Sequence, residues 1–252
     1  INAKPMTAKA SKSPRVLTLD VENSPHLAYT YDLWGADIRP DQIMEPARLL
    51  CWAAKWLDRK QILFASEYHD GIEGMLDGIW ELLNEADIVI TYNGVRHDMP
   101  IILKSLVERG YPPVSPWQDI DLYQVVKRRY KFASNSLGYI TKTLDMPTKL
   151  ATGVPQLWKR VLEEDEKAWT KFRAYNKQDV VVTENLFKAL QPWIKGPHAG
   201  LWSGDLASCP SCGSQNLEPA GLAYTKTAKY ARLLCECGAY CKVLNNGQTR
   251  PV

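Results

Sequence analysis

Three groups of side chains, far apart in the chain, have types and spacings suited to holding metal ions. The first is the pair Asp20 and Glu22, the second is Asp98, and the third is Tyr175 with Asp179. Carboxylate oxygens are the ligands that Mg²⁺ and similar hard cations prefer. Each group also has a simpler explanation alone, so its meaning depends on whether the folded chain brings the groups together.

The acidic pair ends the first apolar segment, VLTLDVE at residues 16–22. Side chains alternate across a strand, so Asp20 and Glu22 point to one face while Val21 points to the other. Two neighbouring carboxylates repel each other, and a bound dication would remove that conflict. Taken alone, an Asp-x-Glu pair is also explained by chance on a protein surface.

Asp98 follows a turn, in the sequence YNGVRHD at residues 92–98. Aspartate is favoured as a helix N-cap, and capping would not exclude metal contact. Another acidic pair, Asp119 and Asp121, alternates on a possible strand. Asp121 is therefore the reserve candidate if Asp98 proves to be only a cap.

Tyr175 and Asp179 lie in the sequence YNKQD. Residues four apart share one face of a helix, so the hydroxyl and the carboxylate can converge on one site. The alternative is that Asp179 is a solvated residue that precedes the apolar run at residues 180–182.

Apolar periodicity and turn residues predict the elements that must position these groups. The order of strands and helices predicts an α/β fold, with helices on the faces of a mixed five-stranded sheet. Strands are expected at residues 16–22, 48–57, 61–66, 88–92 and 119–122, and helices at 70–85, 98–110, 124–129, 136–144, 156–162 and 167–190.

Five of the six cysteines lie between residues 209 and 241. The sequence CPSCG at 209–213 and the later Cys235, Cys237 and Cys241 could supply four thiolates to a structural Zn²⁺. This region resembles a zinc ribbon, although its second Cys pair is one residue shorter than the usual Cys-x-x-Cys. We expect Cys209, Cys212, Cys235 and Cys237 as ligands, with Cys241 in reserve. Disulfides are the alternative, but nothing in the sequence suggests secretion. The sixth cysteine, Cys51, is expected to be a buried structural thiol.

Composition shifts divide the chain into four parts. Residues 1–14 are expected to be a disordered tail or an expression remnant, and residues 15–190 an α/β domain. Residues 191–204 are rich in proline and glycine and predict a linker. Residues 205–252 are too few for an apolar core of their own and would need the metal as a staple.

The acidic motifs resemble, in order and spacing, the three exonuclease motifs of the DEDD superfamily, which is DnaQ-like and ribonuclease-H-like. The phrases TLDVENSP, ADIVITYNGVRHDMPIIL and AYNKQDVVVTENL carry the resemblance across residues 15–190. A tyrosine four positions before the last Asp matches the tyrosine subtype. His97 stands where many members have an aromatic residue. The similarity is strongest to exonuclease domains common in phage and bacterial proteins.

The resemblance implies a 3′–5′ exonuclease that uses two Mg²⁺ or Mn²⁺ ions and releases 5′-mononucleotides. Asp20, Glu22 and Asp179 would hold one ion, Asp20 and Asp98 would hold the other, and Tyr175 would orient the attacking water. Single-stranded DNA or DNA 3′ ends are the expected substrate. A 3′–5′ exoribonuclease or RNA-processing nuclease is the alternative, and a non-catalytic nucleic-acid-binding scaffold is an alternative of another class.

Basic and aromatic residues suggest where nucleic acid could bind. The cluster Lys127, Arg128, Arg129 and Lys131 alternates with Tyr130 and Phe132, types suited to phosphate attraction and base stacking, although a solvated helix face explains it equally well. Asn93 is a further candidate contact. Aromatic residues at 23–34 could stack on terminal bases, but packing in the core is the favoured interpretation. In the ribbon, Lys226, Lys229, Arg232 and Lys242 could contact phosphates, or the ribbon could bind a protein partner.

The composition is that of an ordinary globular protein, with 45% hydrophobic and 23% charged residues. No run approaches the roughly 20 apolar residues that span a bilayer, so we expect no membrane association. An intracellular, cytoplasmic location is expected, in the host cytoplasm if a phage encodes the chain.

Overall fold

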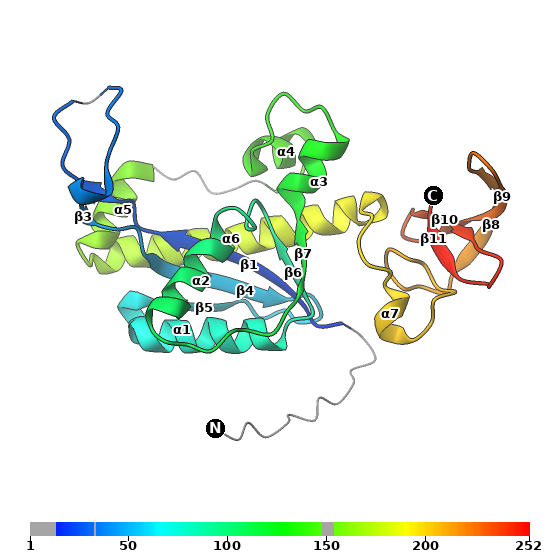
Figure 1. Cartoon of the computed structure of the whole chain (residues 1–252), viewed down its shortest axis with the longest axis horizontal. Coiled ribbons are helices and arrows are strands. Elements are labelled where there is room, and N and C mark those ends of the chain that lie inside the picture. The colour runs from blue at the N-terminus through cyan, green and yellow to red at the C-terminus, as the bar shows by residue number, and fades with distance from the viewer. Residues whose placement is uncertain (1–13, 33, 148–153) are drawn as a thin grey trace, which may run out of the picture. The chain divides into compact units, whose positions relative to one another are not determined.

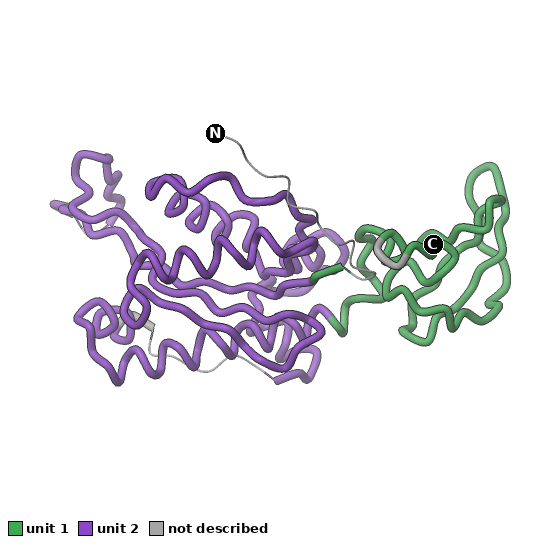
Figure 2. The backbone as a smooth tube through the Cα atoms, turned by 90° about the horizontal axis from the view of Figure 1, so that it is seen from below, with its two compact units in different colours: residues 1–15, 188–252 green, residues 16–187 purple. Residues whose placement is uncertain are grey.

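The computed structural model describes residues 14–32, 34–147 and 154–252. It divides into two compact units, Val16–Phe187 and Lys188–Val252 (Figure 2). The tail expected at residues 1–14 lies outside the described residues except for its last position. No helix in the described ranges is long and apolar enough to cross a membrane.

The first unit is built on a five-stranded sheet with the strand order β5-β4-β1-β6-β7 (Figure 1). β4 pairs antiparallel with β1 and β5, whereas β6 pairs parallel with β1 and β7. The expected mixed five-stranded sheet flanked by helices is therefore confirmed. The strands are β1 (Val16–Asn23), β4 (Leu49–Trp56), β5 (Leu63–Ser66), β6 (Ile88–Thr91) and β7 (Gln118–Asp121).

In the described part of the first unit, six helices accompany the sheet, close to their expected positions. They are α1 (Glu67–Glu85), α2 (Asp98–Glu108), α3 (Leu122–Arg129), α4 (Leu137–Thr143), α5 (Val154–Leu162) and α6 (Glu166–Leu190). α1 begins three residues earlier than expected because the Ser66 hydroxyl accepts a hydrogen bond from the His69 amide and caps its first turn. Non-helical backbone at Gly71 then separates that turn from the rest of α1.

The pleat of β1 assigns its side chains to two different surroundings. Leu17, Leu19 and Val21 are buried in one apolar cluster with residues of α1 and α2. The residues between them point to the opposite face, where Asp20 contacts Asn176 of α6. β1 is thus anchored by apolar packing on one side and presents its carboxylates on the other.

An arm that the sequence did not predict follows β1. It contains β2 (Leu27–Ala28), the 3-10 helix Pro40–Gln42 and β3 (Ile43–Glu45), with β2 and β3 paired antiparallel (Figure 1). The His26 side chain accepts a hydrogen bond from the Ala47 amide at 3.0 Å, which closes the base of the arm.

The second unit carries a four-stranded antiparallel sheet with the order β11-β10-β9-β8. Its elements are the 3-10 helix Gln191–Trp193, α7 (Gly200–Ser203), β8 (Leu217–Tyr224), β9 (Lys229–Cys235), β10 (Tyr240–Val243) and β11 (Thr249–Pro251). Its buried cluster consists of Cys209, Cys235 and Ala239, packed with Cys212, Leu217 and Cys237. A core made largely of cysteines fits the expectation that this region needs a staple.

We predict that one buried ion pair fastens α6 to the sheet. Lys55, opposite Thr18 in the sheet, donates to Glu184 of α6, and 14% and 5% of the two side chains are exposed. Lys55→Met should lower the free energy of unfolding by about 3–5 kcal/mol in urea titrations, because Glu184 is left as a buried charge. The double variant Lys55→Met with Glu184→Leu should recover most of the loss. Equal losses in both variants would contradict this account.

Candidate active site

Three carboxylates from the two ends of the first unit's sequence converge. Asp20 and Glu22 of β1 and Asp179 of α6 each offer an oxygen, and these oxygens all lie within 4.8 Å of one another. Asp179 is buried, and the other two are partly buried. Oxygen ligands at this density suit a hard divalent cation. The structure therefore brings together three of the four expected acidic residues.

Asn176 joins the two elements that carry these carboxylates. Its side-chain amide donates to the Asp20 carboxylate at 2.7 Å and lies 3.2 Å from the Asp20 carbonyl oxygen. Its own carbonyl oxygen accepts from the Cys51 thiol at 3.7 Å. Burial, followed by the charges of Glu22 and Asp20, raises the pKa of Cys51, so the thiol stays protonated and can donate. Cys51 is buried as expected.

Sequence reasoning did not identify Asn176 as a site residue. The sequence offered one indication. Asn176 is a polar residue four positions before the apolar Val180, so both lie on the same, buried face of α6. An amide on an apolar helix face needs a partner, and Asp20 is that partner.

Tyr175 has an aromatic neighbour that also contacts β1. The Trp158 ring of α5 meets the Tyr175 ring edge-to-face at 6.1 Å, and its indole nitrogen donates to the Asn23 carbonyl at 3.1 Å. Trp158 therefore ties the end of β1 to the helix face that carries Tyr175 and Asp179. This contact is a second feature that the sequence did not predict.

Asp98 is the first residue of α2, is buried, and is not the N-cap, a position that His97 occupies without a side-chain hydrogen bond. The capping interpretation of Asp98 is therefore wrong. Among the described residues, the group of carboxylates within 4.8 Å of one another consists of Asp20, Glu22 and Asp179 and does not include Asp98. Asp98 nevertheless lies in the segment that follows β6, and β6 is the strand that pairs in parallel with β1. The chain therefore reaches Asp98 from the strand next to the one that carries Asp20 and Glu22.

The turn before Asp98 is tightly constrained. Asn93 has a positive φ of 68°, which asparagine tolerates better than most residues. A Cβ on Gly94 would lie 2.4 Å from the Cβ of Thr91, so only glycine fits there. The backbone amide of Asn93 donates to the Asp121 carboxylate at 2.8 Å. The Asn93 side-chain oxygen is buried without a hydrogen-bond partner in the described structure.

Asp121, the reserve metal candidate, has a structural role. The same oxygen that accepts from Asn93 also accepts from the amides of Tyr123 and Gln124, at 3.0 and 3.4 Å. Asp121 is thus the N-cap of α3 and links that helix to the turn that precedes Asp98.

The predicted basic cluster lies at the end of the same helix. Lys127, Arg128 and Arg129 form the last turn of α3 and are exposed, as is Lys131 just beyond it. The Lys127 ammonium lies 5.7 Å from the centre of the Tyr123 ring. The exposed cations are therefore connected through α3 and Asp121 to the turn at Asn93.

The aromatic residues after β1 are not packed in the core, so that interpretation is wrong. The exposed fractions are 68% for Tyr29, 100% for Tyr31 and 90% for Trp34. They belong to the arm, which extends away from the sheet and offers no core to bury them (Figure 1).

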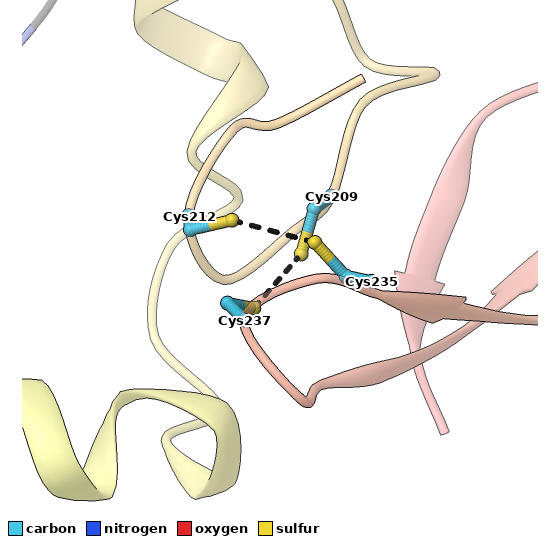
Figure 3. Close-up of side chains that lie close together, drawn as sticks. All are labelled: Cys209, Cys212, Cys235 and Cys237. Carbon is cyan, nitrogen blue, oxygen red and sulfur yellow. Dashed lines mark hydrogen bonds between the residues drawn. The ribbon is translucent and has the colours of Figure 1, made fainter. Parts of the chain in front are cut away.

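The cysteine cluster of the second unit has the geometry of a tetrahedral metal site. Cys209, Cys212, Cys235 and Cys237 point their sulfurs toward one another, all within 4.8 Å (Figure 3). The sulfurs of Cys209 and Cys237 are 3.8 Å apart, and those of Cys212 and Cys235 are 3.6 Å apart. A tetrahedron with Zn–S bonds of about 2.3 Å has edges of roughly 3.8 Å. The buried Cys241 is not in the group.

The sulfur distances also bear on the disulfide alternative. All six cysteines are free, and a disulfide needs a bond of about 2.05 Å. Burial raises the pKa of Cys212 strongly and raises that of Cys237 to about 11. Without a cation these thiols are protonated at neutral pH, so a bound dication would have to displace their protons.

Comparisons with known proteins agree with this fold. Residues 53–191, more than half of the chain, match the family RNase_H_2, described as part of the RNase_H superfamily. The chain belongs to the RNase_H superfamily. The matched range of this superfamily domain contains Asp98, Tyr175 and Asp179 and begins after the Asp20–Glu22 pair.

The fold is also similar to that of a solved polymerase. The family B DNA polymerase from the hyperthermophilic archaeon Pyrobaculum calidifontis matches with a TM-score of 0.52 and 16% sequence identity, over 87% of this chain. The match covers 32% of the polymerase, so this chain spans about a third of that protein's length. A comparison with curated proteins finds no match.

We predict that Asn176 sets the affinity of the acidic group for a divalent cation. Asn176→Leu keeps the size of the side chain but removes the donor that holds Asp20. Mn²⁺ affinity measured by calorimetry should fall by roughly 10- to 100-fold, as is typical when a group that orients a metal ligand is lost. Lys171→Gln, an exposed change on the same helix, should leave the affinity unchanged. Equal affinities for the Asn176 variant and the parent would refute the assignment.

We predict that removing metal from the cysteine cluster unfolds the second unit alone. After chelation, amides in residues 205–252 should exchange hydrogen rapidly, while those of Val16–Phe187 stay protected, because the small sheet has little apolar core. Cys212→Ala should reproduce the loss and abolish zinc binding. Cys241→Ala is the matched control and should retain stoichiometric zinc by elemental analysis. Zinc retained by the first variant and lost from the second would overturn the ligand assignment.

Proposed function

We propose that the chain is a metal-dependent 3′–5′ exonuclease of the DEDD type and tyrosine subtype, which hydrolyses single-stranded DNA or DNA 3′ ends to 5′-mononucleotides. Membership in the RNase_H superfamily supports a nuclease. One observation carries the proposal, the convergence of oxygens from Asp20, Glu22 and Asp179 within 4.8 Å. The likeness to a DNA polymerase supports the choice of DNA.

The residues fit divalent cations because the cluster consists of carboxylates, the donors preferred by Mg²⁺ and Mn²⁺. Asp20, Glu22 and Asp179 would hold one ion, and Asp20 with Asp98 a second. When bound, the pair of ions would stabilise negative charge on the attacking and leaving oxygens of an in-line displacement.

The remaining side chains would position the reacting groups. Asn176 donates to one oxygen of Asp20 and would thereby fix the orientation of that carboxylate. Tyr175, held against Trp158, would orient the attacking water through its hydroxyl. Placing the water in line with the scissile bond removes much of the entropic part of the barrier.

Substrate contacts are proposed at the turn and at α3. The partly buried Asn93 would contact the terminal nucleotide. The exposed cations Lys127, Arg128, Arg129 and Lys131 would attract the phosphates that follow. We further propose the phage or bacterial type and a cytoplasmic location, which rest on the resemblance of the motifs alone.

We predict that Asp20→Asn abolishes hydrolysis and leaves the fold intact. The amide removes one negative charge from the group that would bind the cations, while a similar shape preserves the contact with Asn176. The measurement uses end-labelled single-stranded DNA and RNA with Mg²⁺, Mn²⁺ or chelator, and the ladder of products gives the direction of cleavage. Glu81→Gln, an exposed change on α1, should cleave like the parent.

Three results would count against the proposal. Undiminished cleavage by Asp20→Asn would show that the acidic group is not the catalytic site. Cleavage of RNA in preference to DNA would assign an exoribonuclease instead. Binding of either strand without any cleavage, in Mg²⁺ and in Mn²⁺, would assign a non-catalytic scaffold.

A further inference from the structure

One face of the small sheet in the second unit gathers positive charge. Arg232 of β9 lies directly opposite Lys242 of β10, which in turn lies opposite Arg250 of β11. Residues that face each other across antiparallel strands project to the same side of the sheet. Neighbouring strands are about 4.8 Å apart, so the three residues form a row about 10 Å long. We call Arg232, Lys242 and Arg250 the basic row.

The opposite face of this sheet is already covered. Cys241 and Thr249, which alternate with members of the basic row, are both buried. The Thr249 hydroxyl hydrogen-bonds to the Ser208 carbonyl and to the His198 ring, so the chain around residues 198–208 packs on that side. The basic row projects to the other side, where Arg250 is exposed and Arg232 and Lys242 are partly exposed.

Two tyrosines on the same side hold the cations in place. The Arg232 guanidinium lies 5.4 Å from the centre of the Tyr240 ring, and the Lys242 ammonium lies 5.5 Å from that of the Tyr230 ring. Both are diagonal pairs between β9 and β10, at distances where a cation is attracted to a ring face. Arg232 also donates to the Ala220 carbonyl at 2.8 Å. Side chains fixed in this way lose less entropy when they bind a ligand.

The charges of the row are not balanced by a nearby acid, and a bound anion would reduce their mutual repulsion. Like charges directly opposite on neighbouring strands repel, and no ion pair involves any of the three among the residues that the structure describes. Glu218 projects to the same side, opposite Leu234, but does not pair with the row. Arg232 and Lys242 contact tyrosine rings but no carboxylate, so the row keeps its positive charge.

We propose that the basic row is a second nucleic-acid site, which binds consecutive phosphates of a single strand independently of the catalytic carboxylates. Phosphates along one strand form a linear array of negative charge that complements a row of cations. The exposed Tyr240, 48% accessible, lies beside the row and offers a surface for an adjacent base. This goes beyond hydrolysis, because the site would hold a strand whether or not it is cut.

The test is the salt dependence of binding. The full zinc-loaded chain, carrying Asp20→Asn so that the strand survives, is titrated with a fluorescent single-stranded DNA at several salt concentrations. The plot of log K against log salt has a negative slope. Replacing all three members of the row by glutamine (R232Q, K242Q and R250Q) should make this slope less steep by roughly 2, at about 0.7 per cation. Affinity near 0.1 M salt should fall by roughly 10- to 100-fold.

Two matched variants separate the row from charge in general. Lys60→Gln, Lys167→Gln and Lys195→Gln together remove the same charge from exposed positions outside the row and should change the slope far less. Arg232→Lys with Arg250→Lys keeps the charges and should keep the slope. Zinc content and melting temperature show that each variant is folded.

The outcomes decide the proposal separately from the function of the catalytic site. An unchanged slope in the glutamine variant, or an equal change in the matched control, would overturn the second site and favour an acidic protein as the ligand of this face. Loss of slope in the lysine-for-arginine variant would also overturn it. If the parent chain cleaves no substrate but the glutamine variant still shows the expected change of slope, the second site is supported and only the proposed exonuclease activity is refuted.

Discussion

The first unit must hold three carboxylates close together, two on β1 and one on α6, although like charges repel. At 4–5 Å, two ionised carboxylates repel by on the order of 3 kcal/mol at an effective dielectric constant near 20. Asp20, Glu22 and Asp179 lie within that range, so the fold must keep α6 against β1 despite them. The apolar cluster on the other face of β1 immobilises the strand, and the packing of α6 supplies the opposing force.

Two side chains beside these carboxylates, Asn176 and Lys55, are neutral or already paired with another acid. Asn176 donates to Asp20 without adding a positive charge that would compete with a metal ion. Lys55 projects from the same face of the sheet as Asp20, two positions along, but its ammonium is paired with Glu184. Negative charge at the cluster is therefore left uncompensated by these neighbours. A site built in this way is suited to bind cations more than to stabilise the protein.

Local periodicity was sufficient to predict much of the site. The pleat places Asp20 and Glu22 on one face, and the helical repeat places Tyr175 and Asp179 on one face, so both pairs follow from sequence spacing. The contacts made by Asn176 depend on how α6 is aligned with β1, 156 residues away. The role of Asp121 depends on a contact with Asn93 across 28 residues. No local pattern encodes such long-range alignments.

In the second unit the candidate metal site was predicted from the sequence, but the sheet around it was not. Its cysteine spacing predicts the metal site because four sulfurs on two short turns leave few other arrangements. Its four strands were not predicted, since β10 and β11 have only four and three residues and β8 contains a proline and a glycine. In the described part of this unit, the buried cluster consists of two cysteines and Ala239, and few other apolar residues are buried. Because the core of this sheet is small, a metal held by the four cysteines would fix the turns that keep the basic row in register. The proposed binding face is therefore expected to depend on the metal site.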